Sequence, residues 1–142
     1  DADLNEILWK AEDGEIIGQL DVSRDAKNVV ASVWRKGDGW NIELFNIKSK
    51  QWQKISSGTS IAVNPSYDAA GDIIFSLEKD GVYNLQRYNS TTKQVEQLTN
   101  LLGGAFESSQ ASIGGAIFYS GYSAQGYAIY KMQDDSAFAE TP

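Results

Sequence analysis

The side chains in this sequence that could do chemistry are acidic residues placed beside glycine. Asp13-Gly14, Asp38-Gly39 and Asp80-Gly81 each put a carboxylate next to a flexible position, as calcium-binding loops also do. The same dipeptides are typical of tight hairpin turns, because Asp and Gly tolerate positive φ. The spacing of an EF-hand loop is absent, so we interpret the three pairs as turns and predict no metal site.

Catalytic residue types are scarce. Asp68 and Asp72 flank one turn, but the sequence brings no third acid near them, so hydrolysis by paired carboxylates has no support. The 142 residues include no His and no Cys, which excludes a Ser-His-Asp triad, a thiolate nucleophile and a Cys-based zinc site. We therefore predict that the chain is not an enzyme and holds no cofactor.

Gly103-Gly104 is the remaining motif with a chemical interpretation, as a phosphate-binding loop. A loop of that kind needs a following helix and a Lys, and this sequence has neither beside the two glycines. A tight crossover that passes close to a neighbouring part of the fold explains the pair better.

The overall charge limits the partners. Twelve basic and nineteen acidic residues give a net charge of −7. This charge argues against nucleic acid and against anionic membrane surfaces, which both need a basic face. No apolar run approaches the roughly 20 residues that cross a bilayer, and no signal peptide is recognisable. Because the chain begins with Asp1 and not with Met, we interpret it as a piece of a longer protein.

The elements that must position these residues are short β-strands that recur along the chain. Asn41 matches Asn84 at a separation of 43 residues, and Tyr83 matches Tyr127 at a separation of 44. A repeat of about 40–45 residues that holds four short strands is the period of a β-propeller blade. We expect an all-β fragment over residues 1–132, with blade-like units at about 4–20, 20–57, 61–100 and 105–132, and a flexible acidic tail over 133–142.

The first unit has two interpretations. Ile7 to Trp9 and Ile16 to Leu20 read as two strands around the turn at Asp13-Gly14, the outer half of a preceding blade. Helical spacing of the apolar residues between Leu4 and Ala11 leaves an amphipathic helix as the alternative.

Adjacent apolar residues favour stacked blades over a single open sheet. Val29-Val30, Ile73-Ile74 and Ile117-Phe118 break the alternation expected of a strand that is wet on one face. The chain also has four Trp and seven Tyr, which invite a carbohydrate-binding interpretation. Because Trp40 and its repeat equivalents Tyr83 and Tyr127 return at one position, we predict that they pack between blades, with Trp52 at an inter-blade or outer-edge position.

The repeat resembles the TolB-type, WD-like propeller repeats of bacterial envelope proteins. The resemblance covers roughly residues 20–132. It rests on one ordered set of motifs: Asp-Ala-Ala-Gly-Asp at 68–72, Ile-Ile-Phe-Ser at 73–76, Lys-Asp-Gly at 79–81, Tyr-Asn-Leu at 83–85 and Gln-Leu-Thr at 97–99. The first turn departs from the Ser-Pro-Asp-Gly-Lys that is usual in these repeats. The resemblance implies a partial or open propeller of about three blades made of four-stranded antiparallel sheets.

The resemblance also implies a function. We expect a non-catalytic binding or scaffold module of a larger envelope protein, periplasmic or in the cell envelope, that holds a protein or peptide. The alternative is an accessory propeller of a peptidase whose catalytic domain lies outside this chain. We expect the contacts in non-repeating loops, where the candidate residues are Arg35, Lys36, Asp38, Glu78, Lys79, Asp80, Tyr122 and Gln125, together with the crossovers at 58–60 and 101–104. Open blade faces would also let two copies associate to complete one ring.

Overall fold

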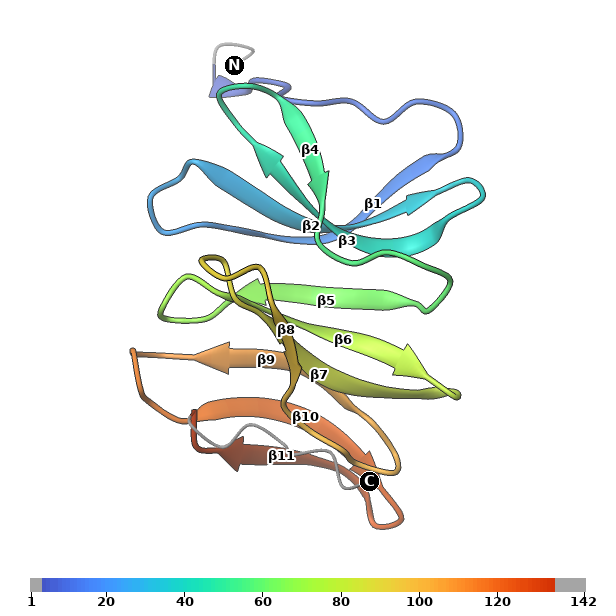
Figure 1. The fold of residues 1–142 in the computed structure, drawn as a ribbon, viewed down its shortest axis with the longest axis vertical. Helices are drawn as coiled ribbons and strands as arrows, with labels where there is room; N and C mark the ends of the chain where they lie inside the picture. Colours follow the sequence, from blue (N-terminus) through green and yellow to red (C-terminus); the bar gives the residue numbers. More distant parts are fainter. Residues whose placement is uncertain (1–3, 135–142) are drawn as a thin grey trace.

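The computed structural model describes residues 4–134, and nearly all of their regular structure is β-strand (Figure 1). The strands are β1 (Glu15–Val22), β2 (Asn28–Arg35), β3 (Gly39–Asn46), β4 (Gln51–Lys54), β5 (Ala62–Tyr67), β6 (Ile73–Lys79), β7 (Val82–Tyr88), β8 (Val95–Gln97), β9 (Ala105–Gln110), β10 (Ile117–Ser123) and β11 (Gly126–Met132).

These strands form three antiparallel sheets that stack along the chain (Figure 1). Blade 1 has the order β1-β2-β3-β4 and blade 2 the order β5-β6-β7-β8, while blade 3 contains β9, β10 and β11. Within each blade, every strand pairs with its neighbours in sequence, because short turns join them. At Asp80-Gly81 both turn residues have positive φ, 54° and 84°, as an Asp-Gly hairpin turn requires. The prediction of an all-β partial propeller is confirmed.

The N-terminal prediction is right for its second strand, because Ile16 to Leu20 lie in β1, but wrong for its first strand and for the blade. Residues 4–14 form neither a strand nor the alternative helix, although the turn at Asp13-Gly14 does form. Glu15–Val22 is the first strand of blade 1 and not part of a preceding blade, since it pairs along β2 from Ile16 opposite Trp34 to Val22 opposite Val29. The other edge of β1 pairs with no strand among residues 4–134. Ile7 to Trp9 lie instead across the face of the sheet, beside Val29, Ala31 and Trp52.

The hydrophobic core lies between the blades in two clusters. Between blades 1 and 2 it contains Val30, Ile42, Ala62, Ile73, Phe75 and Tyr88. Between blades 2 and 3 it contains Ile74, Leu85, Leu98, Ala105, Ile117 and Tyr119. The adjacent residues Ile73 and Ile74, each 1% exposed, therefore point into different clusters. This arrangement confirms that both faces of β6 are buried, as the adjacent apolar pairs predicted.

The recurring aromatic position has different surroundings in different blades. Tyr83 packs against Phe106 of blade 3, with ring centroids 5.3 Å apart, as predicted for a residue between blades. Tyr127 is 80% exposed, so the same prediction is wrong for blade 3, since no further blade follows it within residues 4–134. Trp52 packs against Phe45 on the outer face of blade 1, which agrees with an outer packing position.

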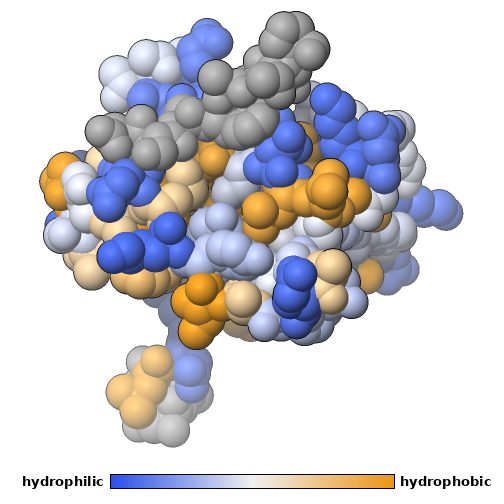
Figure 2. Space-filling view, turned by 90° about the horizontal axis from the view of Figure 1, so that it is seen from below, coloured by the Kyte–Doolittle hydropathy of each residue, from blue (hydrophilic) through white to orange (hydrophobic). Residues whose placement is uncertain are grey.

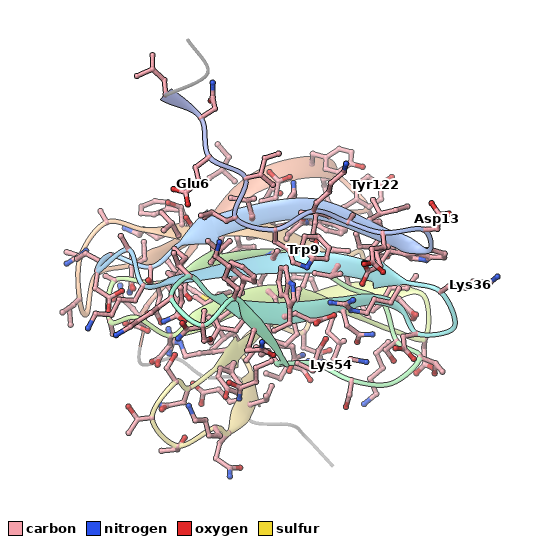
Figure 3. The ribbon with its side chains drawn as sticks, turned by 90° about the horizontal axis from the view of Figure 1, so that it is seen from above. Glu6, Trp9, Asp13, Lys36, Lys54 and Tyr122 are labelled. Carbon is pink, nitrogen blue, oxygen red and sulfur yellow. The ribbon has the colours of Figure 1, made fainter. Side chains whose placement is uncertain are left out.

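The two outer faces of the stack are covered unequally. On blade 1, the N-terminal segment crosses the sheet and Trp9 meets Trp52 edge to face, with centroids 5.2 Å apart (Figure 3). On blade 3, Phe118, Tyr122, Tyr127 and Ile129 are exposed and share one side of the paired strands β10 and β11. Figure 2 views the molecule from this side and shows the apolar surface. We call these four residues the blade 3 patch.

Polar side chains also join neighbouring blades. Asp21 of blade 1 accepts a hydrogen bond from the backbone N–H of Tyr67 at 2.9 Å, and the Ser76 hydroxyl donates to the carbonyl of Ala105 at 3.0 Å. Arg87 of blade 2 pairs with Asp134, just beyond β11. Gln133 and Asp134 are the described part of the predicted tail, and residues 135–142 lie outside the described residues.

The Arg87–Asp134 pair predicts a loss of stability in acid. Burial opposes ionisation of Asp134, but hydrogen bonds from Gln110 and Arg87 outweigh it and lower the pKa of Asp134 below its ordinary 3.8. A carboxyl whose pKa is lowered by folding stabilises above its unfolded pKa, and this stabilisation is lost as the pH falls from about 4 through the lower folded value. Asp134→Asn should therefore cost about 1–3 kcal/mol at pH 6 and less at pH 2. Urea unfolding of both proteins at the two pH values measures this, and an equal difference at both would contradict the assignment.

No helix among residues 4–134 is long and apolar enough to cross a membrane.

Candidate functional site

The turns of the three blades lie at two opposite ends of the strands (Figure 1). The hairpin turns at 36–38, 80–81 and 124–125 lie at one end, together with the crossovers between blades at 55–61 and 98–104. We call this end the crossover face. The remaining turns, at 23–27, 47–50, 68–72, 89–94 and 111–116, lie at the opposite end. All eight candidate residues from the sequence lie on or next to the crossover face.

In blade 1, Arg35 is not in a loop, contrary to the prediction. It is the last residue of β2, where its guanidinium pairs with Glu15 and with Glu43, the latter at 2.8 Å. The hydrogen bond to Glu43 raises the pKa of Arg35. Lys36 is exposed in the turn, and Asp38 forms an exposed ion pair with Lys54 at 3.0 Å. The structure therefore uses Arg35 to hold blade 1 together and leaves Lys36 accessible.

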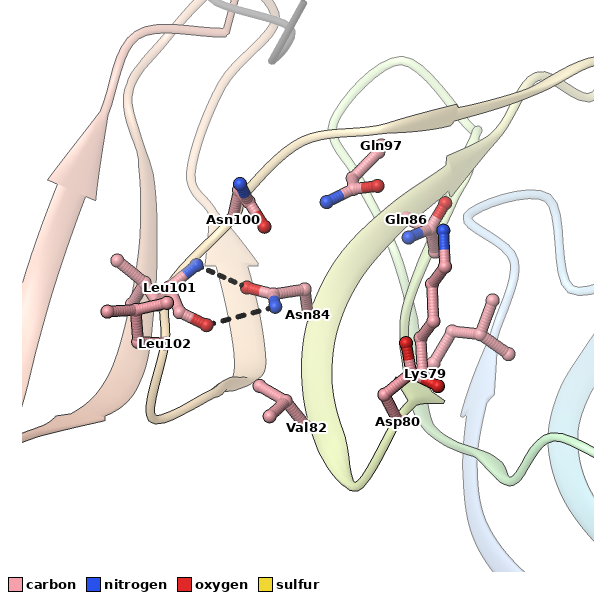
Figure 4. Close-up of a pocket in the computed structure, with 10 residues that line it drawn as sticks. Lys79, Asp80, Val82, Asn84, Gln86, Gln97, Asn100, Leu101 and Leu102 are labelled. Carbon is pink, nitrogen blue, oxygen red and sulfur yellow. Dashed lines mark hydrogen bonds between the residues drawn. The ribbon is translucent and has the colours of Figure 1, made fainter. Parts of the chain in front are cut away.

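In blade 2, Glu78 and Lys79 end β6, and Asp80 begins the turn. The Glu78 carboxylate accepts a hydrogen bond from the backbone N–H of Gly81 at 2.9 Å, which supports that turn. Lys79 and Asp80 line a hollow of about 330 Å³ on the outer part of blade 2 (Figure 4). We call it the amide hollow, because four of its side chains are amides: Asn84, Gln86, Gln97 and Asn100.

In blade 3, Tyr122 is also in a strand and not in the predicted loop. It pairs with Tyr127 across β10 and β11, and the two rings lie 4.8 Å apart. Gln125 lies in the two-residue turn and accepts a hydrogen bond from the Ser123 hydroxyl at 3.1 Å. Tyr122 lines a second hollow, of about 510 Å³, with Ser123, Ala124 and the crossover. We call it the apolar hollow.

The crossover at 98–104 separates the two hollows, and Asn100, Leu101 and Leu102 line both. The structure thus brings Lys79 and Asp80 to one side of this crossover and Tyr122 to the other. Arg35, Lys36 and Asp38 of blade 1 line neither hollow, and neither do Glu78 and Gln125.

Hydrogen bonds fix the conformation of this crossover. The side-chain amide of Asn84 accepts from the backbone N–H of Leu101 at 2.8 Å and donates to the Leu101 carbonyl at 3.1 Å (Figure 4). The same Asn84 oxygen accepts from the Thr99 hydroxyl at 2.9 Å. Asn41 and Ser56 make the equivalent contact in blade 1, at 3.0 Å. The recurrence of Asn at positions 41 and 84 was therefore the sequence signal for these hydrogen bonds.

The two glycines of the crossover bring it close to its neighbours, as predicted. A Cβ at Gly103 would lie 1.8 Å from the carbonyl oxygen of Tyr122, and Gly104 has φ 114°. The Gly104 carbonyl accepts a hydrogen bond from the Tyr122 N–H at 3.0 Å. Leu102, between these restraints, is 95% exposed. The crossover therefore holds an apolar side chain in water on a fixed backbone.

The acidic residues considered for hydrolysis are structural. Asp68 is buried, lies 3.2 Å from Arg87, and accepts a hydrogen bond from the backbone N–H of Asp72 at 2.8 Å. The Asp72 carboxylate accepts from the N–H of Ser90 at 2.9 Å. Among the described residues, no group of three or more His, Cys, Asp or Glu could hold a metal ion.

The sequence did not reveal a third hollow, of about 720 Å³, at the opposite end of the strands. Its walls come mainly from the first turns of blades 1 and 2 and the strand ends beside them, with Asp21, Asp25 and Tyr67. Lys93, from the turn between β7 and β8, also lines it. Burial, helped by the charges of Asp21 and Asp25, raises the pKa of Tyr67 to about 12. The Tyr67 hydroxyl is therefore neutral at physiological pH.

Comparison with solved structures decides the fold. The chain is similar to TolB from Acinetobacter baumannii, with a TM-score of 0.71 and 18% identity over 85% of this chain and 31% of that one. It is similar to a putative TolB from Agrobacterium tumefaciens, with a TM-score of 0.72 and 18% identity over 88% of this chain and 48% of that one. The fold is that of a partial TolB-type β-propeller.

A peptidase structure contains the same arrangement. The chain is similar to dipeptidyl peptidase 4 from Porphyromonas gingivalis, with a TM-score of 0.68 and 15% identity over 95% of this chain and 21% of that one. The partial propeller thus spans less than half the length of each of these three structures. No protein-family model and no curated protein matches the sequence.

Proposed function

We propose that this partial propeller is a non-catalytic binding and scaffold module of a larger bacterial envelope protein, and that it mediates a protein or peptide interaction. The observation that carries the proposal is Leu102, which is 95% exposed on a hydrogen-bonded crossover between two hollows. An apolar side chain on a preorganised backbone contributes to binding with little further loss of conformational entropy. The likeness of the repeats to those of bacterial envelope proteins supports a place in the periplasm or cell envelope.

Affinity capture from a bacterial envelope extract tests this proposal. The immobilised chain should retain one or more proteins, and Leu102→Asp should retain much less of them, because it places a charge where the apolar contact forms. Ile113→Asp is the matched control, since Ile113 is also exposed but lies in a turn at the opposite end of the strands. Equal retention by all three proteins, or retention by none, would refute the proposal.

A second proposal is an accessory propeller of a peptidase. The observation in its favour is the alignment of 95% of this chain with the P. gingivalis dipeptidyl peptidase. The catalytic domain would then lie elsewhere in the parent protein. Reading the parent gene for a nucleophile elbow or a zinc-protease motif tests it, and a parent without either motif rules it out.

We also propose that the protein associates with a second copy of itself through the blade 3 end of the stack. The N-terminal segment lies over part of the outer face of blade 1, with Trp9 on Trp52, whereas the blade 3 patch is open. We therefore expect two copies to meet through their blade 3 patches and not to complete one ring head to tail. An interface between identical patches forms a closed dimer.

Light scattering measures the molar mass of the chain in solution and so tests this expectation. The wild-type chain should be a dimer at high concentration, and Ile129→Asp should shift it to a monomer, because Ile129 is 84% exposed in the patch. Ile113→Asp should leave the dimer intact. A wild-type monomer at every concentration would exclude the interface.

A further inference from the structure

Blades 1 and 2 differ at one pair of equivalent positions on the sheet. In blade 1, Arg35 and Glu43 lie on the same face and form an ion pair at 2.8 Å. The strand registers place Lys79 and Gln86 at the same two positions in blade 2. A neutral amide thus replaces the carboxylate, and Lys79 and Gln86 both line the amide hollow (Figure 4).

The hollow has two amides that the fold itself does not use. Asn84 accepts two hydrogen bonds from the crossover and donates one to it, and Gln97 donates to the carbonyl of Thr99 at 2.7 Å. Within residues 4–134, the side chains of Gln86 and Asn100 make no hydrogen bond to the protein, and the oxygen of Gln97 accepts none. Donors and acceptors on three amides are therefore available to a ligand at one hollow.

The chemistry of these groups favours a polypeptide backbone. A primary amide offers two N–H donors and a carbonyl acceptor, which complement the acceptor and donor of an extended peptide unit. Lys79 and Asp80 line the hollow with charges of opposite sign, so the hollow does not select a strongly charged ligand. No aromatic side chain lines the amide hollow, so a sugar ring has no surface there on which to stack.

The apolar hollow adds a requirement on the ligand's side chains. It begins on the other side of Leu101 and Leu102 and is lined by Gly103, Tyr122 and Ala124. An extended segment that passes over Leu102, between the two hollows, can place its backbone at the side-chain amides of the amide hollow. It can place an apolar side chain against Leu102 and Tyr122. We infer that the crossover face binds an extended, uncharged peptide segment with one apolar anchor residue. This inference rests on the proposed protein-binding function and specifies its site and its ligand.

Selection from a display library of random nine-residue peptides tests the inference on the intact 142-residue chain. Enriched peptides should carry an apolar residue at a fixed place. The double variant Gln86→Ala with Asn100→Ala, and separately Leu102→Asp, should each weaken their binding by about tenfold or more. Gln53→Ala is the matched control, because Gln53 is an exposed amide on β4 of blade 1 and should leave the affinity unchanged.

The NMR signals of the side-chain amides give a second readout. It is measured on the wild-type chain, so destabilisation by a substitution cannot cause the result. In the wild-type chain, a selected peptide should shift the signals of Gln86, Gln97 and Asn100. Peptides that bind with unchanged affinity to both variants would overturn this site, whereas the capture experiment on envelope extract decides the proposed function separately. Enrichment of no peptide, together with capture of no protein from the envelope extract, would overturn both. Shifts caused by neutral oligosaccharides and not by peptides would overturn the peptide assignment.

Discussion

Gly103→Ala is expected to destabilise the protein by about 3 kcal/mol or more. The added Cβ would lie 1.8 Å from the carbonyl oxygen and 2.5 Å from the carbonyl carbon of Tyr122. Both atoms belong to the backbone, so no side-chain rotation relieves the overlap. The crossover must move away from β10, which breaks the 3.0 Å hydrogen bond between the Tyr122 N–H and the Gly104 carbonyl. Urea unfolding followed by tryptophan fluorescence measures the loss.

Gly37→Ala is the control for this substitution. Gly37 has φ 91°, but a Cβ there would meet nothing within 4 Å. Its replacement should cost only the strain of the left-handed backbone, about 1–2 kcal/mol. A cost for Gly103→Ala no larger than that for Gly37→Ala would show that the crossover is not packed against blade 3 as described.

Phe75→Ala is expected to cost about 3–5 kcal/mol. Phe75 is 2% exposed and lies in the cluster between blades 1 and 2, where Ile42 and Tyr88 surround it. Truncation removes the buried ring and leaves a cavity that the two rigid sheets cannot close. Since small domains are stable by about 5–15 kcal/mol, the change is a large share of the total. The midpoint of urea unfolding reports it.

Phe118→Ala separates this effect from the loss of a phenylalanine in general. Phe118 is 46% exposed on the outer face of blade 3, so its removal should cost about 1 kcal/mol or less. The same substitution should weaken dimer formation, because Phe118 belongs to the blade 3 patch. Similar costs at positions 75 and 118 would mean that the stack of blades is not the core of the fold.

The repeat made the fold predictable from the sequence. The match of Asn41 with Asn84 placed the third strands of blades 1 and 2, and the structure shows both residues in the same role beside a crossover. The adjacent pair Ile73-Ile74 indicated a strand buried on both faces, since only stacked sheets make such a strand stable. Local periodicity carries this information because every blade repeats the same environment.

The ends of the stack could not be predicted in this way. Tyr127 occupies the repeat position of Tyr83, but its exposure depends on whether another blade follows and not on its own sequence. Ile7 to Trp9 have the composition of a strand, but they pack across the face of blade 1, with Trp9 on Trp52, and do not pair with the outer edge of β1. Arg35 looked like a loop residue because its partners, Glu15 and Glu43, lie 20 and 8 positions away.

The candidate site was predictable only in outline. Lys79, Asp80 and Tyr122 were predicted as loop residues. Lys79 and Tyr122 lie at the ends of β6 and β10 instead, but two hollows do adjoin the three residues. The amides of Gln86, Gln97 and Asn100 were missed, because a lone Gln or Asn on a strand has no distinguishing pattern. Their convergence depends on how β7, β8 and the crossover meet in space.

Site-specific photo-cross-linking tests most directly whether binding takes place on the crossover face. A benzophenone amino acid at position 102 lies between the two hollows, and one at Lys48 lies in an exposed turn at the opposite end of the strands. After irradiation with envelope extract, the account predicts a cross-linked partner from position 102, identified by mass spectrometry, and none from position 48. Cross-linking of the partner from position 48 alone, or from neither position, would contradict it.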